Sequence, residues 1–581
     1  MCGIISYIGV ENCIPNLIGG IKKLEYRGYD SFGCAVVVEG KIFVMKDIGS
    51  INTNIEKYKI AEFSSNLSAF HTRWATHGGI TLENAHPHLD CAGKIAVVHN
   101  GIIENYEDMR EKLTNHHFLS ETDTEIIPHM IENKIMKGAP FYEAVMSTAK
   151  ELKGSSSFVA ISSDVEEMVA VKVGSPLIIG VAEKGYFVSS DVPSVLDYTN
   201  SIIYLSDGDL IHLTKHDYKI HNIFGLATEH KIYTINPKYI DMDLGHFSHY
   251  MEKEIYDQLN LWKPLRKTIF SKINAASAEI SRSHRVYLIG SGSSFHVCLF
   301  GAVLIRESGI DALAMQPHEI QNFVKIIQND DILIIISQSG ETADIIHYLR
   351  LIPDNRKIGI INVEHSQLTR KVDILLPMSV GIERGVAATK SVTNSMLILT
   401  YLKYAILERT KEIETNENLL ELNKFSLVVP SIEHKIDEVA HLLFEEKTLF
   451  VVGSGICYAL ALEAALKIKE VTYIHAEAID LVSLKHGPLA MIESGTKVIV
   501  ILNEDEYVPN VDEIKARGAY IIGISEKRLS NYDQFIRMIS VGNLFFAPVL
   551  FVVQLIAYKI ALLKGIDPDK PRNLAKSVTV R

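Results

Sequence analysis

The stretch HRVYLIGSGSSFHVCLFGAVLI, from His284 to Ile305, decides the fold of the second half of the chain, because a similar stretch follows later in the sequence. Its counterpart, KTLFVVGSGICYALALEAALKI, runs from Lys447 to Ile468, and the serines of the two G-S-G turns stand 163 positions apart, at 291 and 454. Each copy reads as a short apolar strand, a glycine-rich turn and an apolar helix. A repeat of this kind indicates a duplicated domain.

Further apolar runs follow at matching places in the two copies. DILIIIS ends at Ser337 and KIGIINV spans 357–363, while KVIVIL ends at Leu502 and YIIGIS spans 520–525. Continuous apolar strands that alternate with helices are typical of a parallel sheet covered on both faces, so each copy is predicted to be a doubly wound α/β domain. Ligands of such domains gather at the carboxyl ends of the strands.

The first 240 residues or so have a different pattern. Strands come in runs, as in 31–49 and 157–192, with turn signals between them and few helices. This pattern predicts a separate domain of antiparallel β structure with some helix, and places the junction in the polar stretch from Asn236 to His249.

The composition narrows the class of partner. The chain has 581 residues, of which 47% are hydrophobic, and a formal net charge of −12, which argues against nucleic acid and favours small molecules. The six cysteines show no C-x-x-C spacing, so neither a zinc site nor a disulfide framework is expected, and a reducing cytoplasm is. No metal or cofactor is predicted. The amino terminus lacks the basic region of a secretory signal.

One segment approaches the length of a membrane span: LFFAPVLFVVQLIAYKIALL, residues 544–563. Pro548, Gln554 and Lys559 interrupt it, and a similar segment, NSMLILTYLKYAIL, occurs at 394–407. Two such segments at equivalent places in a repeat favour packing helices of the core. A membrane span is the alternative.

The stretch ISQSGETADIIHYL (336–349) predicts an anion site. Its strand ends at Ser337 and its helix begins near Thr342, so Gln338 and Ser339 lie with them at a helix amino terminus. Ordinary helix capping is the alternative, but it needs only one such side chain. Neither G-x-x-x-x-G-K-[ST] nor G-x-G-x-x-G occurs, so a phosphosugar is favoured over a nucleotide. The G-S-G-S-S turn (290–294) belongs at the edge of the same pocket.

The chain begins MCGIISYIG, with a cysteine behind the initiator methionine. Removal of Met1 would leave a thiol and a free α-amine on Cys2. Their ordinary pKa values, about 8.5 and about 7.7–8.0, let the amine take the thiol proton without a histidine. The alternative is an ordinary small second residue.

Taken together, the motifs identify a resemblance. The chain resembles the family of glutamine:fructose-6-phosphate aminotransferases (isomerising), the glucosamine-6-phosphate synthases, nearly from end to end. The resemblance implies an α+β N-terminal-nucleophile (class II glutaminase) sandwich followed by two α/β sugar-isomerase (SIS) domains with parallel sheets. The motifs are MCGI, LEYRGYDS (24–31), HTRWATHG (71–78), NAHPH, HNGIIEN (99–105), SETDTE (120–125), SQSGET, KIKEVTYIHAEA (467–478), LKHGPLA (484–490) and PRNLAKSVTV. The domain limits expected from it are 1–238 for the glutaminase, 239–265 for a linker, 266–420 and 436–566 for the SIS domains, and 567–581 for a tail.

The resemblance also implies an activity: amination and isomerisation of fructose 6-phosphate with glutamine, giving glucosamine 6-phosphate and glutamate, the first step of hexosamine (UDP-N-acetylglucosamine) synthesis. It implies a homodimer in which the loop bearing His486 serves the neighbouring subunit, and a Trp74 channel gate for ammonia. Glu463, Lys467 and Glu470 fall at helical spacing on one face. The implied catalytic residues are Cys2, Asn100, Gly101, Glu470, His486, Lys576 and Lys467; glutamine is expected at Arg73, Trp74, His77 and Asp123; and the sugar phosphate is expected at Ser293, Ser294, Ser337, Gln338, Ser339, Thr342, Val386 and Ala575.

Some positions depart from the family pattern. Ser454 and Ala464 stand where the family commonly has Arg and Gly, Ser483 where it has Glu, and Lys172 where it has Arg. None is an implied catalytic residue, but Ser483 bears on the loop that holds His486. Two alternatives therefore stay beside the aminotransferase: an enzyme that aminates or deaminates another phosphosugar, and a sugar-phosphate sensor without catalysis.

Overall fold

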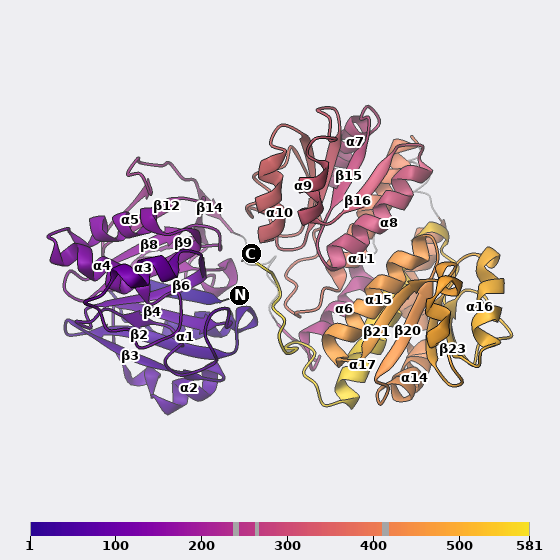
Figure 1. Cartoon of the computed structure of the whole chain (residues 1–581), viewed down its shortest axis with the longest axis horizontal. Coiled ribbons are helices and arrows are strands. Elements are labelled where there is room, and N and C mark those ends of the chain that lie inside the picture. Colours follow the sequence, from indigo (N-terminus) through magenta and orange to yellow (C-terminus); the bar gives the residue numbers. More distant parts are fainter. Residues whose placement is uncertain (1, 236–242, 262–266, 409–416, 580–581) are drawn as a thin grey trace. The chain divides into compact units, whose positions relative to one another are not determined.

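The computed structural model describes residues 2–235, 243–261, 267–408 and 417–579 (Figure 1). The chain divides into two compact units. The first comprises Met1–Asp241 with the short segments Glu341–Ala343 and Ala575–Arg581, and the second comprises Met242–Gly340 and Asp344–Leu574.

The first unit is built on two antiparallel sheets, as the sequence predicts. The eight-stranded sheet has the order β14-β11-β9-β10-β1-β4-β2-β3, and the six-stranded sheet has the order β13-β12-β8-β7-β6-β5. The strands are β1 (Gly3–Gly9), β2 (Ser31–Val38), β3 (Lys41–Ile48), β4 (Leu67–Arg73), β5 (His88–Leu89), β6 (Ile95–Ile103), β7 (Gly154–Ser162), β8 (Glu167–Lys172), β9 (Ile178–Ala182), β10 (Gly185–Ser189), β11 (Ser201–Tyr204), β12 (Asp209–Leu213), β13 (Tyr218–Asn222) and β14 (Ile232–Thr234).

Side chains along the strands point alternately to the two faces of each sheet, and they form three hydrophobic layers. Side chains such as Ile4 and Val98 meet between the two sheets, Ile5 and Phe70 face α1 and α2, and Val97 faces α4 and α5. The result is a four-layer α-β-β-α sandwich that confirms the predicted fold class. Its helices are α1 (Ile14–Lys22), α2 (Ile51–Lys57), α3 (Tyr106–Lys112), α4 (Ile126–Met136) and α5 (Phe141–Glu151).

The second unit contains the predicted duplication. Its two five-stranded sheets are wholly parallel and have equivalent orders, β16-β15-β17-β18-β19 and β21-β20-β22-β23-β24. The strands are β15 (Val286–Ile289), β16 (Ala312–Met315), β17 (Ile332–Ser337), β18 (Arg356–Ile361), β19 (Ile374–Pro377), β20 (Thr448–Gly453), β21 (His475–Asp480), β22 (Lys497–Ile501), β23 (Tyr520–Ser525) and β24 (Gln534–Arg537).

Helices pack on both sheets of this unit, and Figure 1 shows α8 beside β16 of the first sheet and α15 beside β21 of the second. The helices α11 and α17 pack in turn on α8 and α15. The helices are α6 (Tyr250–Leu261), α7 (Lys267–Ile280), α8 (Ser293–Glu307), α9 (Ile320–Phe323), α10 (Ala343–Tyr348), α11 (Lys390–Ile406), α13 (Glu417–Asn423), α14 (Phe425–Leu443), α15 (Ile456–Thr472), α16 (Val508–Lys515) and α17 (Phe546–Leu563).

The two G-S-G turns repeat each other in detail. Gly292 and Gly455 both have φ of 56°, with ψ of −128° and −126°, a left-handed region that glycine enters at no steric cost. A Cβ on Gly290 would lie 2.7 Å from the Ser294 carbonyl oxygen, and one on Gly453 would lie 2.6 Å from that of Cys457. The first glycine of each turn therefore lets the helix pack closely on its strand.

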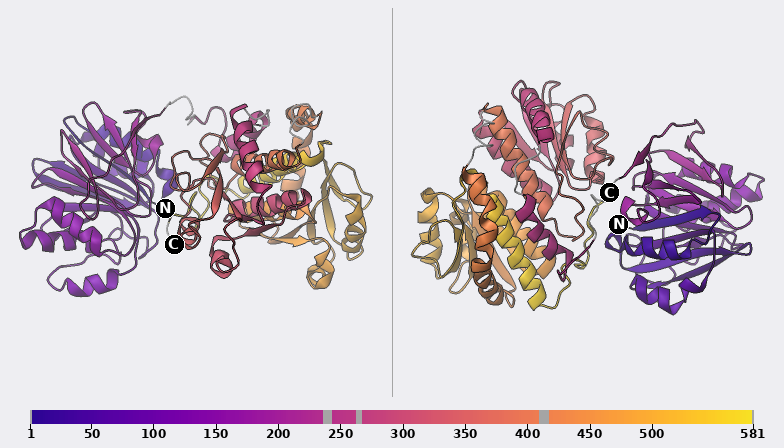
Figure 2. Two further views of the ribbon diagram at one scale, coloured as in Figure 1. Left: turned by 90° about the horizontal axis from the view of Figure 1, so that it is seen from above. Right: turned by 180° about the vertical axis from the view of Figure 1, so that it is seen from behind.

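The apolar segment at 544–563 forms α17. Among the described residues, one stretch, Gly542–Leu563, is long and apolar enough to span a membrane, and it contains α17. The most apolar 18-residue window of this stretch has a mean hydropathy of 2.1, and 83% of that window is buried inside the protein. The helix α17 packs against α14, as Figure 2 shows, and against α15, while the similar segment at 394–407 lies in buried α11. These contacts support the core interpretation of both segments.

The expected linker, 239–265, contains α6, which packs against α11 and α17. Residues 239–242 and 262–265 lie outside the described residues, as does the first half of the predicted junction, 236–242. The domain limits given above therefore stay predictions.

Candidate active site

Cys2 immediately precedes β1, which lies near the middle of the eight-stranded sheet between β10 and β4. The Trp74 backbone N–H donates to the Cys2 Sγ at 3.2 Å, and the Trp74 carbonyl oxygen lies 3.5 Å from the same sulfur. The Arg27 Nε donates to the Cys2 carbonyl oxygen at 3.2 Å. The residue is thus fixed by both its sulfur and its backbone.

One pocket gathers six of the residues that the resemblance implies. They come from separate elements: the end of β4, β6, and the turn that precedes α4. The six are Cys2, Arg73, Trp74, His77, Gly101 and Asp123, and the remaining lining residues are Thr76, His86, His99, Thr122 and Thr124.

Asn100 lies on β6 beside this pocket. Its Nδ2 donates to the Cys2 carbonyl oxygen at 3.0 Å and to the Ser190 Oγ at 2.9 Å. The His71 Nε2 lies 3.2 Å from the Asn100 Oδ1 and 3.1 Å from the His99 carbonyl oxygen. Both partners are acceptors, so His71 carries its proton on Nε2, and it holds the amide of Asn100 with the nitrogen toward Cys2.

Two glycines allow the chain to close around the cysteine. A Cβ on Gly101, whose φ is +152°, would lie 1.9 Å from the Ser155 carbonyl oxygen. A Cβ on Gly28 would lie 2.7 Å from the Arg73 carbonyl carbon and 2.8 Å from the Trp74 nitrogen. Both positions therefore exclude any larger side chain.

Opposite charges line the same pocket. The Arg73 guanidinium donates to the carbonyl oxygens of Gly79, at 3.0 Å, and His77. The Asp123 Oδ2 accepts from the Ile103 backbone N–H at 2.7 Å. Both side chains are buried yet line the pocket, so it presents one cationic and one anionic group, which complement the carboxylate and the ammonium group of a small molecule.

The buried histidines near Cys2 are neutral. Burial lowers the pKa of His86 and His99, and burial with the nearby Arg73 charge lowers the pKa of His71 to about 3. The His99 Nδ1 pairs with the Thr124 Oγ1 at 2.8 Å. Burial also raises the pKa of the Cys2 thiol, so the sulfur needs a proton acceptor before it can attack.

In the second unit, a buried charge network joins the two repeats. Glu463 and Lys467 on α15 are fully buried with their charged atoms 3.4 Å apart, and the Lys467 Nζ lies 2.5 Å from the Glu470 carboxylate. From α8, the Ser293 Oγ donates to Glu463 at 3.0 Å and the His296 Nδ1 lies 2.7 Å from it. The predicted common face of α15 is confirmed, and it is a buried face.

Charge complementarity sets the ionisation of this network. Burial alone would raise the pKa of Glu463, but Lys467 and the hydrogen bonds from α8 hold it below its usual value. Burial would lower the pKa of Lys467, but the two carboxylates raise it. The pair is therefore charged at neutral pH.

The remaining predicted residues lie on several separate segments of the chain. β17 ends at Ser337 as expected, and the Ser337 Oγ accepts from the Gly340 backbone N–H at 3.0 Å. Gln338, Ser339 and Thr342 follow in the turn before α10, Ser294 is in the first turn of α8, and Val386 is buried before α11. His486 is exposed, in the short helix Ser483–His486. Ala575 and Lys576 lie in the tail grouped with the first unit.

The departures from the family pattern have local partners. The Ser454 Oγ donates to the Asp480 carboxylate at 3.0 Å and accepts from the Val482 backbone N–H at 3.3 Å. Asp480 also accepts from the Ser483 backbone N–H at 3.0 Å. The Lys172 Nζ pairs with Asp207 at 2.5 Å. Ser454 thus anchors the loop that leads to His486.

Known protein families match both the antiparallel first unit and the duplicated second unit. A glutamine amidotransferase domain model matches residues 71–197, and an SIS domain model matches residues 279–403 and 442–561. The chain is 39% identical to the glutamine–fructose-6-phosphate aminotransferase (isomerizing) of Pyrococcus horikoshii and 38% identical to that of Clostridium tetani, with 100% of both chains covered in each case.

The chain belongs to the glutamine–fructose-6-phosphate aminotransferase (isomerizing) family. Among solved structures, the carboxyl-terminal domain of the glucosamine-fructose-6-phosphate aminotransferase from Francisella tularensis covers 57% of this chain, with 100% of its own length, 26% identity and a TM-score of 0.51. The resemblance inferred from the motifs is confirmed at the level of family and fold.

Several residues that contact the site residues are not predicted from the sequence. His71 and Arg27 lie inside the recognised motifs HTRWATHG and LEYRGYDS, which could have directed attention to them. Ser190 and His296 had no such signal. The spacing of Glu463 predicts its place on the face of α15 but not its contact with α8.

Proposed function

We propose that this chain transfers the amide nitrogen of glutamine to fructose 6-phosphate and isomerises the product to glucosamine 6-phosphate, releasing glutamate. The observation that carries the proposal is the pocket in which Cys2 meets Arg73, Gly101 and Asp123. Family membership supports the same reaction.

Glutamine binds with its α-carboxylate on Arg73 and its α-ammonium on Asp123, which presents the side-chain amide to Cys2. The cysteine sulfur attacks the amide carbon. Burial lowers the pKa of His86 and His99, which makes both histidines poor proton acceptors, and the His99 Nδ1 is already hydrogen-bonded to Thr124. The thiol proton therefore goes to the α-amine that Met1 removal exposes. That amine then protonates the departing ammonia, and water hydrolyses the thioester to glutamate.

The negative oxygen of the tetrahedral intermediate is stabilised by the Asn100 side-chain amide and the Gly101 backbone N–H. His71 supports this role, because it accepts no proton near neutral pH and fixes the orientation of the Asn100 amide. One such donor contributes roughly 3–4 kcal/mol to the stability of the transition state in other hydrolases.

Ammonia that escaped into water would be protonated and would lose its nucleophilicity, so the proposal includes a dry passage gated by Trp74. The second reaction opens the ketose ring with His486 as acid, forms an imine between C2 and the Lys576 amine with loss of water, and exchanges that amine for ammonia. Glu470, steadied by Lys467, then moves a proton from C1 to C2. The sugar phosphate binds near Ser337, Ser339 and Thr342.

The assembly is proposed to be a homodimer in the cytoplasm. His486 is exposed on its own chain, as expected of a residue that serves a neighbouring subunit. All six cysteines are free, which suits a reducing compartment.

The test is product formation by the purified chain, with glutamate and hexosamine phosphate measured by mass spectrometry. We expect both products from glutamine and fructose 6-phosphate, and an intact mass that lacks Met1. Cys2→Ala should abolish glutamine-dependent synthesis while ammonium salts still support it. Absence of hexosamine phosphate with wild-type protein, or undiminished use of glutamine by Cys2→Ala, would refute the proposal.

A second candidate is amination of a different phosphosugar, which the Ser454 and Ser483 departures beside the His486 loop favour. A panel of ketose and aldose phosphates separates the two. Glutamine hydrolysis in any of these assays excludes a sensor without catalysis.

A further inference from the structure

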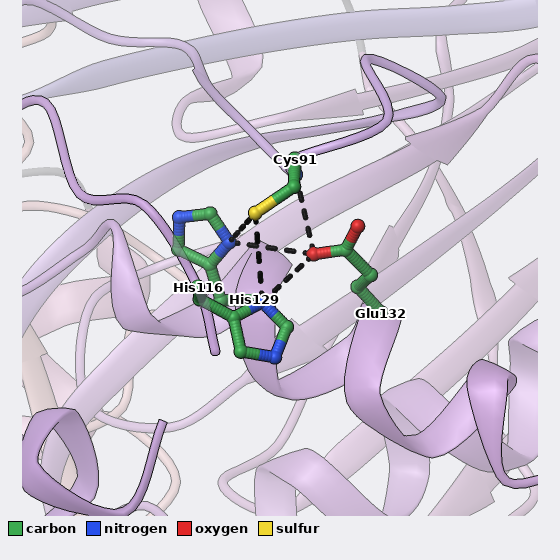
Figure 3. A group of neighbouring side chains, drawn as sticks. All are labelled: Cys91, His116, His129 and Glu132. Atoms are coloured by element: carbon green, nitrogen blue, oxygen red, sulfur yellow. Dashed lines mark hydrogen bonds and ion pairs between the residues drawn. The ribbon is translucent and has the colours of Figure 1, made fainter. Parts of the chain in front are cut away.

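Four side chains with metal-binding atoms meet on the first unit, apart from the residues that line the Cys2 pocket. Cys91 follows β5 and His116 follows α3. His129 and Glu132 are three positions apart on α4, so they lie on the same face of that helix. Figure 3 shows all four turned toward a common point. One ligand atom from each lies within 4.8 Å of all the others.

The distances between the four ligand atoms suit an ion with tetrahedral coordination. The Cys91 Sγ lies 3.7 Å from the His116 Nδ1 and 3.6 Å from the His129 Nδ1. The Glu132 Oε2 lies 3.5 Å from the His129 Nδ1 and 2.9 Å from the His116 Nδ1. An ion with bonds of about 2.0 Å to nitrogen or oxygen and about 2.3 Å to sulfur separates its ligands by about 3.3–3.5 Å. Small movements would therefore admit it.

We propose that Cys91, His116, His129 and Glu132 bind one zinc ion. A thiolate, two imidazoles and a carboxylate form a four-ligand set, and sulfur with imidazole favours zinc over the oxygen-seeking magnesium or calcium. With no ligand position left open, the ion would have a structural role. The proposal does not depend on the reaction of the enzyme.

The surroundings are those of a structural site. The side chains of His129, His116 and Glu132 are 2%, 7% and 11% exposed, whereas Cys91 faces solvent and gives the ion access. The His129 Nε2 is buried without a hydrogen-bond partner and faces the Glu125 carboxylate at 4.0 Å. With zinc on the Nδ1, the Nε2 would carry the proton toward that carboxylate, an arrangement common behind zinc ligands.

The position of the site suggests what the ion does. The segment between His116 and His129 carries Asp123, the acidic group of the Cys2 pocket. Glu125 holds the same segment through the backbone N–H groups of Leu119 and Ser120, at 2.8 and 2.7 Å. A zinc ion that joins His116 to His129 would close this segment into a loop and fix Asp123 relative to β6.

No sequence motif predicts this site, because the four ligands are 25, 13 and 3 positions apart and lack the paired cysteines of common zinc motifs. The competing interpretation is a hydrogen-bonded cluster without metal, in which His116 pairs with Glu132. Cys91→Ser separates the two, because a serine hydroxyl keeps the size and hydrogen bonds of the thiol but is a poor zinc ligand.

The experiment loads the full chain with Zn²⁺, removes the excess by dialysis and measures bound metal by mass spectrometry. His117→Ala is the matched control, since this exposed histidine neighbours His116 but is not in the cluster. We expect one zinc per chain in the wild type and in His117→Ala, and at least about tenfold weaker zinc binding in Cys91→Ser. Co²⁺ substitution should give a thiolate charge-transfer band that Cys91→Ser lacks.

A wild-type chain that retains no zinc after dialysis would overturn the proposal, as would a cobalt spectrum that is the same in Cys91→Ser. Because metal content and spectra are read without substrate, this outcome is independent of whether the chain makes glucosamine 6-phosphate. The proposed role adds one kinetic expectation: chelation should raise the KM for glutamine in the wild type but not in Cys91→Ser.

Discussion

The buried pair Glu463–Lys467 supports a quantitative prediction about the second unit. In Glu463→Gln the side chain keeps its size and can still bond Ser293 and His296, but the Lys467 ammonium loses one of its two carboxylates. The lysine is fully buried, so its charge cannot be solvated by water. The substitution therefore tests the charge of the pair and not its packing.

The expected magnitude follows from what Lys467 retains. Removing one partner of a buried ion pair costs about 3–5 kcal/mol of unfolding free energy. Glu470 remains 2.5 Å away and is partly exposed, so the lower end, about 3 kcal/mol, applies. For a unit of roughly 330 residues, with an unfolding entropy of about 2.1 cal/mol/K per residue, this lowers Tm by about 4 °C.

The loss of stability in Glu463→Gln should be constant near neutral pH and smaller at the extremes of pH. The folded pKa of Glu463 is lowered, so its contribution is present above the unfolded value of about 4.3 and is lost as pH falls through the folded value. The folded pKa of Lys467 is raised, so its contribution is present below about 10.4 and is lost as pH rises through the folded value. The difference between wild type and Glu463→Gln should therefore be constant between about pH 5 and 10.

Differential scanning calorimetry of the full chain measures these shifts. The double variant Glu463→Gln with Lys467→Leu removes both charges, and we expect it to recover most of the lost Tm, because no uncompensated charge then stays buried. A Tm for Glu463→Gln within 1 °C of wild type would refute the reasoning, as would a double variant no more stable than the single one.

Three further substitutions test the two reaction sites. Asn100→Ala should lower glutamine hydrolysis by about 100- to 1,000-fold in kcat, with ammonia-dependent synthesis retained, in parallel assays of glutamate and hexosamine phosphate. Gly101→Ala places a Cβ 1.9 Å from the Ser155 carbonyl oxygen and should abolish glutaminase turnover and cost about 1–3 kcal/mol in urea unfolding. Ser454→Ala loosens the His486 loop and should lower hexosamine formation severalfold while glutamate release stays unchanged; equal loss of both products would contradict it.

Local pattern was enough to predict the parallel domains. The sequence predicts the end of β17 at Ser337 and both ends of β23, because buried parallel strands read as uninterrupted apolar runs bounded by turn residues. The two G-S-G turns were found because glycine is required there by positive φ and by close helix packing. Where the backbone conformation allows only one residue type, that residue type predicts the conformation from the sequence.

Contacts between distant segments were not predictable in this way. Nothing in the spacing of Glu463, Lys467 and Glu470 indicates that α8 brings His296 to within 2.7 Å of Glu463. A row of charges at helical spacing is typical of a solvated face, and only the packing of α8 on α15 makes it a buried one. The cluster around Cys91 escaped for the same reason, since its members meet only after three segments have folded together.

The duplication shows that the fold of the SIS domain does not require the buried pair. The two repeats are offset by 163 positions, so Phe300 and Leu304 on α8 occupy the places that Glu463 and Lys467 hold on α15. Phe300 and Leu304 are buried in the core, which shows that the same helix in the same architecture packs well with apolar side chains. Burying two charges instead carries a desolvation cost without a clear gain in stability. In the function proposed above, the contribution of the pair is to orient Glu470, which is partly exposed at the end of the row.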